Sequence, residues 1–245
     1  MLAVLADIHG NLPALQAVVA DLKQRQIDTV LNLGDHASGP LWPQETVAFL
    51  MQQPWIQIAG NHDRQLVQQD PATHGASDRY AFERLGAPEK RWLQALPAQI
   101  RIEPDLLLCH GTPSHDNVYL LETVEHGTVR LARHAEITQR LAGVRARILL
   151  CGHTHTPRVI QIDDTMLIVN PGSVGLPAYA DAEPEPHVME TGAPHARYAI
   201  LTQQDQGWRV ELIAVAYDYQ QAANQAQRNG RLDWASGLRT GYLQA

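Results

Sequence analysis

Five short polar clusters, each at the end of an apolar run, constrain this chain more than any other feature. They combine aspartate, asparagine and histidine with glycine. In order they are Asp7-Ile8-His9, Gly34-Asp35, Gly60-Asn61-His62-Asp63, Cys109-His110-Gly111 and Gly152-His153-Thr154-His155. A short motif of common residues arises by chance, but five in one order at strand ends predict a shared metal-binding site.

The segments between these clusters predict a layered α/β fold. Short apolar stretches alternate with segments in which apolar residues recur at helical spacing. In the first part of the chain, strands are expected at residues 2–6, 29–32 and 55–59. The helices between them begin at Asn11, a capping residue followed by Pro13, and at Pro43. A further polar helix is predicted to begin near Asp63.

The second part of the chain is predicted to be richer in strands. They are expected at residues 99–103, 106–109, 147–151, 158–162, 166–170, 198–202 and 208–214. The first two form a hairpin across Pro104-Asp105, and turn signals such as Gln206-Gly207 favour antiparallel pairing of the later strands. Helices are predicted at about 128–141 and 218–229. Residues 175–196, rich in Pro, Glu and His, are predicted to be a loop.

Residues 70–97 differ from their surroundings, because charged and aromatic residues recur there at helical spacing. We predict two short helices, the second beginning at Pro88, inserted ahead of the hairpin. The insert is a candidate for setting substrate choice. No linker marks a domain boundary, so residues 1–245 are predicted to form a single domain that carries this insert.

Composition and charge limit the partners of the chain. Its 245 residues, 44% of them hydrophobic, suffice for a sizeable core, and a net charge of −7 disfavours strong nucleic-acid binding. The first apolar run reaches Asp7 without a basic start or a cleavage site, and no run approaches the ~18 residues of a membrane span. We expect a cytoplasmic protein without membrane contact, in which Cys109 and Cys151 are buried thiols.

The clusters have the chemistry of a two-metal site. Residues two apart in an extended chain project to the same side, so Asp7 with His9, and His153 with His155, can each serve one ion. Oxygen and imidazole ligands without thiolate suit manganese, iron, cobalt, nickel or zinc. Asp35 follows a strand and has two oxygens, so it can bridge two ions ~3.5–4 Å apart that stabilise a phosphoryl displacement.

Taken together, the clusters resemble those of the calcineurin-like metallophosphoesterases. The matching blocks are the five above, extended to Asp7-Ile8-His9-Gly10-Asn11 and followed by Asn170-Pro171-Gly172-Ser173. The resemblance runs from the first strand to about Val174. Within this family, the chain is most similar to the small bacterial and archaeal members of phosphodiesterase type.

The resemblance implies a fold and a set of roles. The fold would be a four-layer α-β-β-α sandwich of two mixed sheets, with the site at strand ends. The first metal ion would bind Asp7, His9, Asp35 and His155, and the second would bind Asp35, Asn61, His110 and His153. Asn61 and His62 would contact the substrate, and His62 would protonate the leaving group. The catalytic residues would be His62 and Asp35. A hydroxide shared by the two ions would attack phosphorus, and manganese is the metal expected before the others.

The departures from the family pattern also carry information. Phosphoprotein phosphatases and symmetric dinucleoside tetraphosphatases have an Asp and an Arg shortly after the bridging Asp, and GNHE in the third block. Here His36-Ala37-Ser38-Gly39-Pro40 follows Asp35, and the third block ends in Asp63, which is predicted to cap a helix. His36 has no assigned role and is left open between a substrate contact and a supporting group.

We therefore predict a metal-dependent phosphoesterase acting on a small phosphorylated substrate, with phosphodiesters favoured over phosphomonoesters. The alternatives are a dinucleoside polyphosphate or nucleotide hydrolase, a protein phosphatase, and a non-catalytic protein-binding scaffold of the same fold. The sequence leaves open the oligomeric state. The other histidines are predicted to be solvated: His74, His115, His126, His134, His187 and His195. Entry of either His187 or His195 into the site is left open.

Overall fold

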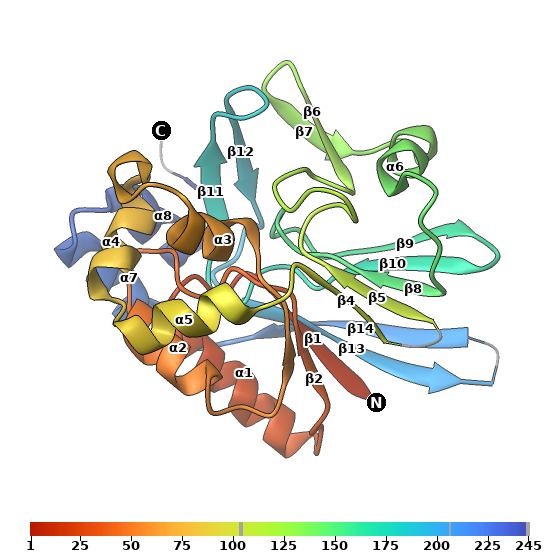
Figure 1. The fold of residues 1–245 in the computed structure, drawn as a ribbon, viewed down its shortest axis with the longest axis horizontal. Coiled ribbons are helices and arrows are strands. Elements are labelled where there is room, and N and C mark those ends of the chain that lie inside the picture. The colour runs from red at the N-terminus through yellow and green to blue at the C-terminus, as the bar shows by residue number, and fades with distance from the viewer. Residues whose placement is uncertain (103–104, 206, 244–245) are drawn as a thin grey trace.

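Two five-stranded sheets form the centre of the computed structural model, which describes residues 1–102, 105–205 and 207–243 (Figure 1). In spatial order, the strands of the first sheet are β14 (Gly207–Val215), β13 (Ala196–Gln204), β1 (Leu2–Leu5), β2 (Val30–Asn32) and β3 (Ile56–Gln57). Those of the second sheet are β4 (Gln99–Ile102), β5 (Leu106–Cys109), β8 (Ile148–Leu150), β10 (Met166–Asn170) and β9 (Arg158–Asp163). In the first sheet, β2 pairs in parallel with β1 and β3, and β13 pairs antiparallel with β1 and β14. In the second sheet, β8 pairs in parallel with β5 and β10, and the edge strands β4 and β9 pair antiparallel with β5 and β10, so both sheets are mixed.

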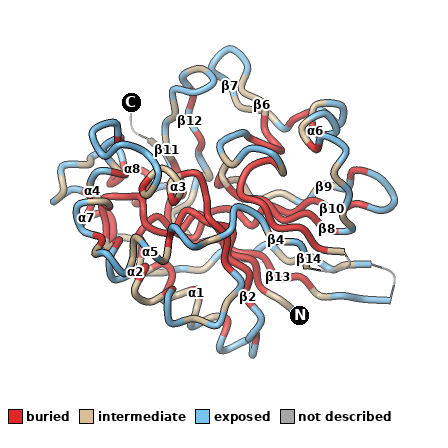
Figure 2. Tube along the Cα trace, in the orientation of Figure 1, coloured by how far each residue is buried: buried red, intermediate tan, exposed pale blue. Residues whose placement is uncertain are grey.

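Side chains that alternate along the strands of the first sheet form two apolar clusters, one on each face of that sheet. In β1 and the residue after it, Val4 and Ala6 face the second sheet and pack in one cluster with Leu108 and Leu150. Leu5 belongs to the cluster on the opposite face. Because both faces of these strands are covered, their runs are continuously apolar. Figure 2 shows the strands of both sheets buried at the centre of the molecule.

Helices cover the outer face of each sheet. Those on the first sheet are α1 (Leu12–Gln24) and α2 (Pro43–Leu50), whose apolar faces pack on Leu5 and Tyr198. On the second sheet, α6 (His134–Leu141) packs Ile137 and Leu141 against the strands. The four-layer α-β-β-α sandwich of two mixed sheets is therefore confirmed. Asn11 caps α1 by accepting from the N–H of Ala14, as predicted.

The segment predicted as a helical insert contains helices. After α3 (Asn61–Gln68) come a short 3-10 turn (Pro71–Thr73), α4 (Ala76–Arg84) and α5 (Ala87–Ala95). Ala81, Leu85 and Leu93 of this segment pack with Val47 and Leu66 in one buried cluster. The insert is thus anchored to α2 and α3, beside the carboxyl ends of the first sheet (Figure 1).

Two predictions in the second half were wrong. Residues 128–131 form strand β7 (Thr128–Leu131), paired with β6 (Glu122–Glu125), so α6 begins only at His134. His126 and Gly127, with φ values of 55 and 72 degrees, are the two left-handed positions that turn the chain between these strands.

The predicted loop at 175–196 is also a hairpin. Its strands are β11 (Ala178–Asp181) and β12 (His187–Glu190), paired antiparallel. Residues of β12 alternate between buried and exposed positions, a period that the Pro and Glu residues of the turn obscure in the sequence. The predicted positions Glu103, Pro104 and Gln206 lie outside the described residues.

The C-terminal part adds two helices. The predicted polar helix is α7 (Tyr219–Arg228), capped by the side chain of Asp218. A second helix, α8 (Leu232–Thr240), was not predicted; it buries Trp234 and Leu238 against the alanine face of α7. No helix in the described ranges has the length and apolar character needed to cross a lipid bilayer.

Candidate metal centre

The predicted ligands meet at the carboxyl ends of the parallel strands of both sheets. Asp7 and Asp35 follow β1 and β2, and Asn61 begins the helix after β3. His110 follows β5, and His153 and His155 follow β8. Because carboxyl ends of parallel strands share one edge, two sheets packed face to face bring these distant segments into one place.

The first group of ligand atoms comes from Asp7, His9 and His155, which lie within 4.8 Å of one another. The Nε2 atoms of His9 and His155 are 3.1 Å apart, and the Nε2 atom of His155 is 3.5 Å from Oδ1 of Asp7. All three residues are buried. The geometry is that of a cluster able to surround one cation.

The second group comes from Asp35, His110 and His153, also within 4.8 Å of one another. The Oδ2 atom of Asp35 is 3.3 Å from Nε2 of His110 and 3.8 Å from Nε2 of His9, a member of the first group. One carboxylate oxygen therefore lies between the two groups. Its other oxygen, Oδ1, accepts the backbone N–H of His62 at 2.9 Å.

Three of the imidazoles are held so that Nε2 faces the centre. The Nδ1 atoms of His9, His110 and His155 lie 2.7–2.8 Å from the backbone carbonyls of Ser38, Leu33 and Leu176, respectively. A carbonyl only accepts, so Nδ1 carries a proton in each ring, and Nε2 is the atom that can bind a metal ion when the ring is neutral.

The donor atoms left over fit a metal pair. The Nε2 lone pairs of His9 and His155 face one another, an arrangement that a cation between them stabilises. Nε2 of His110 and Oδ1 of Asn61 are buried and have no hydrogen-bond partner among the described residues. Buried polar atoms are rarely left so, and a bound ion accounts for both.

The backbone at the centre is unusual. Asp7, His9, Asp35, His153 and His155 all have positive φ, between 52 and 69 degrees. The left-handed region costs a non-glycine residue roughly 1–2 kcal/mol, and such positions cluster at functional sites. Five of the seven predicted ligands thus hold a conformation that only the surrounding structure can impose.

Glycines flanking these ligands permit close approach of the strand ends. A Cβ atom on Gly60 would collide with the carboxylate of Asp35, and one on Gly34 would collide with the backbone of Gly60. These two glycines are therefore required for this close packing and not only for tight turns. They allow α3 to start directly against Asp35.

Charge balance in the cluster shifts several pKa values. Burial raises the pKa of Asp35, but the neighbouring charges of His110 and His62 lower it well below its usual value. Burial, with the charge of a neighbouring histidine, lowers the pKa of His9 to about 4 and that of His153 to about 3. Burial also lowers that of His110, but Asp35 and Asp7 raise it to about 10.

His62 stands at the edge of the cluster rather than within it. Its ring packs edge-on to that of His9, with centroids 5.6 Å apart, and a third of its side chain is exposed. Its Nδ1 atom lies 2.8 Å from Oδ1 of Asp78 on α4. Burial lowers the pKa of His62, but Asp35 and Asp78 raise it to about 9.

The roles of Asp63 and His36 follow from one hydrogen-bond network. The carboxylate of Asp63 accepts the backbone N–H groups of Asp35, His36 and Gly60 and lies 2.7 Å from Nδ1 of His36. Asp63 is therefore a cap of α3, as predicted. His36 is fully buried against Trp92 of α5, so it supports the loop after Asp35 and does not face the pocket.

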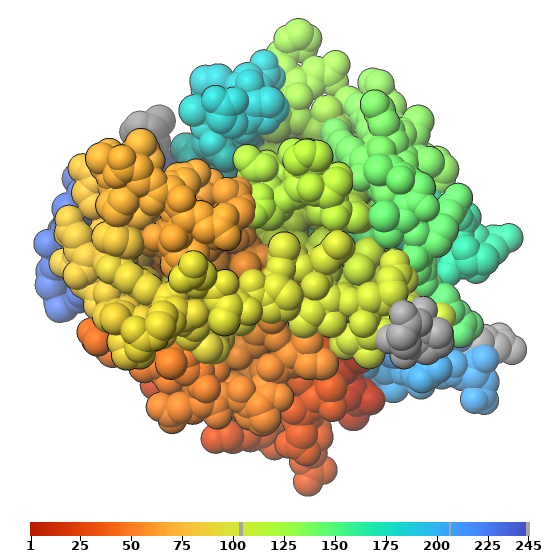
Figure 3. Space-filling view, viewed as in Figure 1, coloured from red at the N-terminus to blue at the C-terminus, as the bar shows by residue number. Residues whose placement is uncertain are grey.

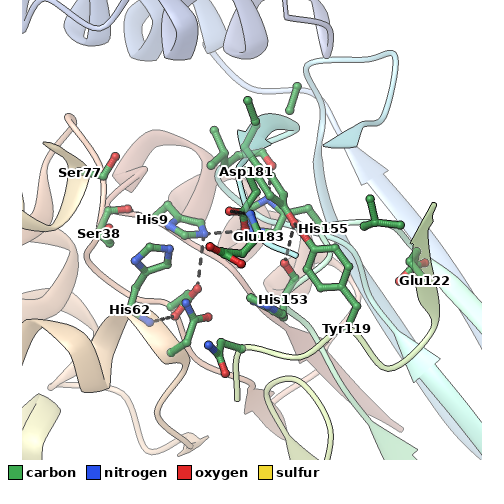
Figure 4. Close-up of a pocket in the computed structure, with 18 of the residues that line it drawn as sticks. His9, Ser38, His62, Ser77, Tyr119, Glu122, His153, His155, Asp181 and Glu183 are labelled. Carbon is green, nitrogen blue, oxygen red and sulfur yellow. Dashed lines mark hydrogen bonds and ion pairs between the residues drawn. The ribbon is translucent and has the colours of Figure 1, made fainter. Parts of the chain in front are cut away.

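The centre forms the base of a pocket of about 780 Å³. Figure 4 shows His9 and His62 on one side and His153 with Tyr119 on the other, and the rings of Tyr119 and His153 have centroids 5.0 Å apart. Its outer lining comes from α4, α8, β6 and β11. In Figure 3 the insert, orange to yellow, lies at the left, and the β6–β7 and β11–β12 hairpins, green and teal, lie at the top. The sequence did not identify Tyr119, Tyr179 or Trp234 as lining residues, because they lie outside the motifs and come together only through elements that were not predicted.

His187 departs from its predicted solvated state. It is buried, and its Nε2 lies 2.9 Å from the hydroxyl of Tyr119, which is 2.8 Å from that of Tyr179. Tyr179 in turn donates to the carbonyl of His153. The β11–β12 hairpin is thereby tied to a candidate metal ligand. His74 is buried as well, against Phe82, and not solvated.

The family model described as a calcineurin-like phosphoesterase superfamily domain matches residues 1–193 of this chain. The chain belongs to that superfamily. Members depend on two metal ions, and membership supports an enzyme that hydrolyses phosphoesters. The buried Asp and His clusters of this calcineurin-like phosphoesterase are groups that can bind metal.

Three other proteins resemble this calcineurin-like phosphoesterase over its length. A metallophosphoesterase of Sphaerobacter thermophilus has a solved structure with a TM-score of 0.75 and 23% identity, and 98% of each chain is covered. A hypothetical protein of Pyrococcus horikoshii OT3 gives a TM-score of 0.73 and 20% identity over 100% of both chains. An uncharacterised protein of Methanocaldococcus jannaschii is 25% identical over 256 residues, covering 96% of this chain and 95% of its own. The structural matches show a shared fold.

Proposed function

We propose that this protein is a metal-dependent phosphoesterase that favours small phosphodiesters and uses two divalent ions, with manganese the first candidate and iron, zinc, nickel or cobalt the alternatives. The observation that carries the proposal is the placement of Oδ2 of Asp35 between two buried ligand groups at the base of a pocket. The whole chain would act as one domain, with residues 70–97 as a helical insert.

The seven proposed ligands divide between two metal positions. Asp7, His9, Asp35 and His155 would hold one ion, and Asp35, Asn61, His110 and His153 would hold the other, with Asp35 shared. When bound, such a pair supplies an activated water nucleophile and Lewis-acid stabilisation of the phosphoryl oxygens. Asn61, with its unpaired Oδ1 buried at the start of α3, fits the second position.

His62 is proposed to act on the substrate. Its ring lines the pocket next to the ligand groups without belonging to either. A protonated imidazole there can stabilise a phosphoryl oxygen and deliver a proton to the departing alcohol. Removal of such a group typically costs about 10²–10⁴-fold in rate.

Charge in the pocket favours a diester over a monoester. The arginines of the lining are Arg140, which donates to the carbonyls of Leu120 and Glu122, and Arg231, which donates to Asp233. Both are engaged, so neither is a free clamp for the doubly charged phosphate of a monoester. A diester carries one charge fewer and needs space for a second ester group, which a pocket of about 780 Å³ provides.

The test compares esters on protein loaded with manganese. We expect faster hydrolysis of bis-p-nitrophenyl phosphate than of p-nitrophenyl phosphate, and loss of both activities after chelation. A preference for the monoester would reverse the substrate assignment. No metal-dependent turnover of either ester would contradict catalysis and favour the alternative of a protein-binding scaffold.

A second candidate is a nucleotide or dinucleoside polyphosphate hydrolase. The observation in its favour is the presence of Tyr119, Tyr179 and Trp234 in the pocket lining, since aromatic rings stack with bases. A panel of dinucleoside polyphosphates, nucleotides and simple diesters separates the two candidates by kcat/KM. A protein phosphatase is disfavoured by the missing arginine after Asp35.

A further inference from the structure

The partner of His62 comes from the helical insert. Asp78 lies on α4, and its Oδ1 is 2.8 Å from Nδ1 of the imidazole. The carboxylate is 9% exposed, against 33% for the side chain of His62. Asp78 is therefore behind the ring, whereas His62 belongs to the described lining of the pocket.

This contact determines which ring nitrogen faces the substrate. An ionised carboxylate only accepts, so a contact of 2.8 Å between Oδ1 of Asp78 and Nδ1 of His62 requires a proton on Nδ1. Nε2 is then the atom directed to the pocket. A fixed tautomer and ring orientation are what a carboxylate supplies to a histidine that handles protons.

Helix α4 is itself braced from the C-terminal end of the chain. Arg231 at the start of α8 donates to the hydroxyl of Ser77, and Asn229 at the end of α7 donates to that of Tyr80. These contacts flank Asp78 on both sides in the sequence. The insert and the C-terminal helices together hold the carboxylate against His62.

We propose that Asp78 is the positioning residue for His62, so that the helical insert completes proton delivery to the leaving group. The proposal rests on the function proposed above. It deepens the substrate assignment, because a proton donor matters most when the departing alcohol is a poor leaving group. The natural substrates would then be esters of ordinary aliphatic alcohols rather than of acidic phenols.

A simpler explanation of Asp78 is its position in the first turn of α4, where an acid is favourable to the helix. That role would stabilise the helix without affecting the chemistry. The two explanations differ in their dependence on the leaving group, since helix stability does not distinguish one departing alcohol from another.

The kinetic test uses Asp78→Asn, which retains the shape of the side chain, and a series of methyl aryl phosphodiesters of rising leaving-group pKa. We expect a loss of kcat of about 10–100-fold for the poorest leaving group, the range typical of a lost supporting hydrogen bond at a metal site. The loss should become small for p-nitrophenol, with unchanged metal content. Glu83→Gln, an exposed position on the same helix, is the matched control and should leave the series unchanged.

An equal loss for every leaving group, or loss of bound metal, would overturn the proposal. A second measurement needs neither turnover nor a folded variant. Long-range nitrogen–proton NMR of the wild-type imidazoles should show His62 protonated at Nδ1 in a slowly exchanging hydrogen bond. A His62 ring whose Nδ1 carries no proton would also overturn it. If the wild-type protein hydrolyses no ester but shows the Nδ1 proton, then the proposed function has failed while the pairing of His62 with Asp78 stands.

Discussion

The base and the walls of the pocket differ in origin and in rigidity. The base, made of the seven predicted ligands, comes from strand ends, and six of the seven are buried. The walls are made of the lining residues of α4, α8, β6 and β11, which belong to the insert, two hairpins and a C-terminal helix. They include exposed positions such as Asp233 of α8. Strained, buried ligands suit fixed chemistry, whereas exposed peripheral elements suit selection of the substrate.

The largest expected effect comes from the residue shared by both ligand groups. Asp35→Asn should lower kcat by more than about 100-fold, since loss of a mere supporting partner at a metal site costs about 10–100-fold. It should also lower the bound metal at both positions, measured by elemental analysis. Asp164→Asn, in an exposed turn, is the matched control. Full metal content and activity in Asp35→Asn would contradict the assignment of metal binding and catalysis to the base of the pocket.

Metal removal should lower the stability of the folded protein, because the ions bind the residues at the base of the pocket and not those of its walls. An ion that binds only the folded protein adds about 2.7 kcal/mol when its concentration is 100 times its Kd. We therefore expect chelation to lower the Tm of the wild-type protein. The Tm of Asp35→Asn should respond much less to the same chelator. An equal response of both proteins would mean that the metal acts elsewhere.

The difference between base and walls also explains what the sequence could predict. Asp7, Asp35 and His155 were recognisable because each follows an apolar strand in a short motif. The walls lack such motifs: β11 and β12 are separated by Pro and Glu residues, and α8 follows Gly230 so closely that only its packing on α7 marks it as a helix. Asp78 is invisible in the sequence, because nothing local relates it to His62, 16 residues earlier.

Within the base, the two ligand groups should differ in their proton balance. At pH 8, His9 and His153, with pKa values of about 4 and 3, are already neutral, whereas His110, with a pKa of about 10, is protonated. Metal must displace that proton, so affinity at the second position should rise with pH up to about 10, by at most tenfold per pH unit.

Titration calorimetry in buffers of different ionisation enthalpy measures this release. Metal binding at pH 8 should release about one proton from His110, because a ligating imidazole must be neutral. His110→Asn should abolish that share of the release. An unchanged release in the variant would place the displaced proton on another group and end the distinction between the two positions.

The smallest effect is expected in the walls. Asp181 of β11 lines the pocket and is partly exposed, so its charge repels an anionic ester only weakly. Exposed charge interactions are worth about 0.2–1 kcal/mol, so Asp181→Asn should lower KM by roughly 1.5- to 5-fold and leave kcat unchanged. The decrease should be larger for substrates that carry additional phosphates and should vanish at high salt, because screening removes exposed interactions first. A change in kcat with constant KM would show instead that the wall takes part in the chemistry of the base.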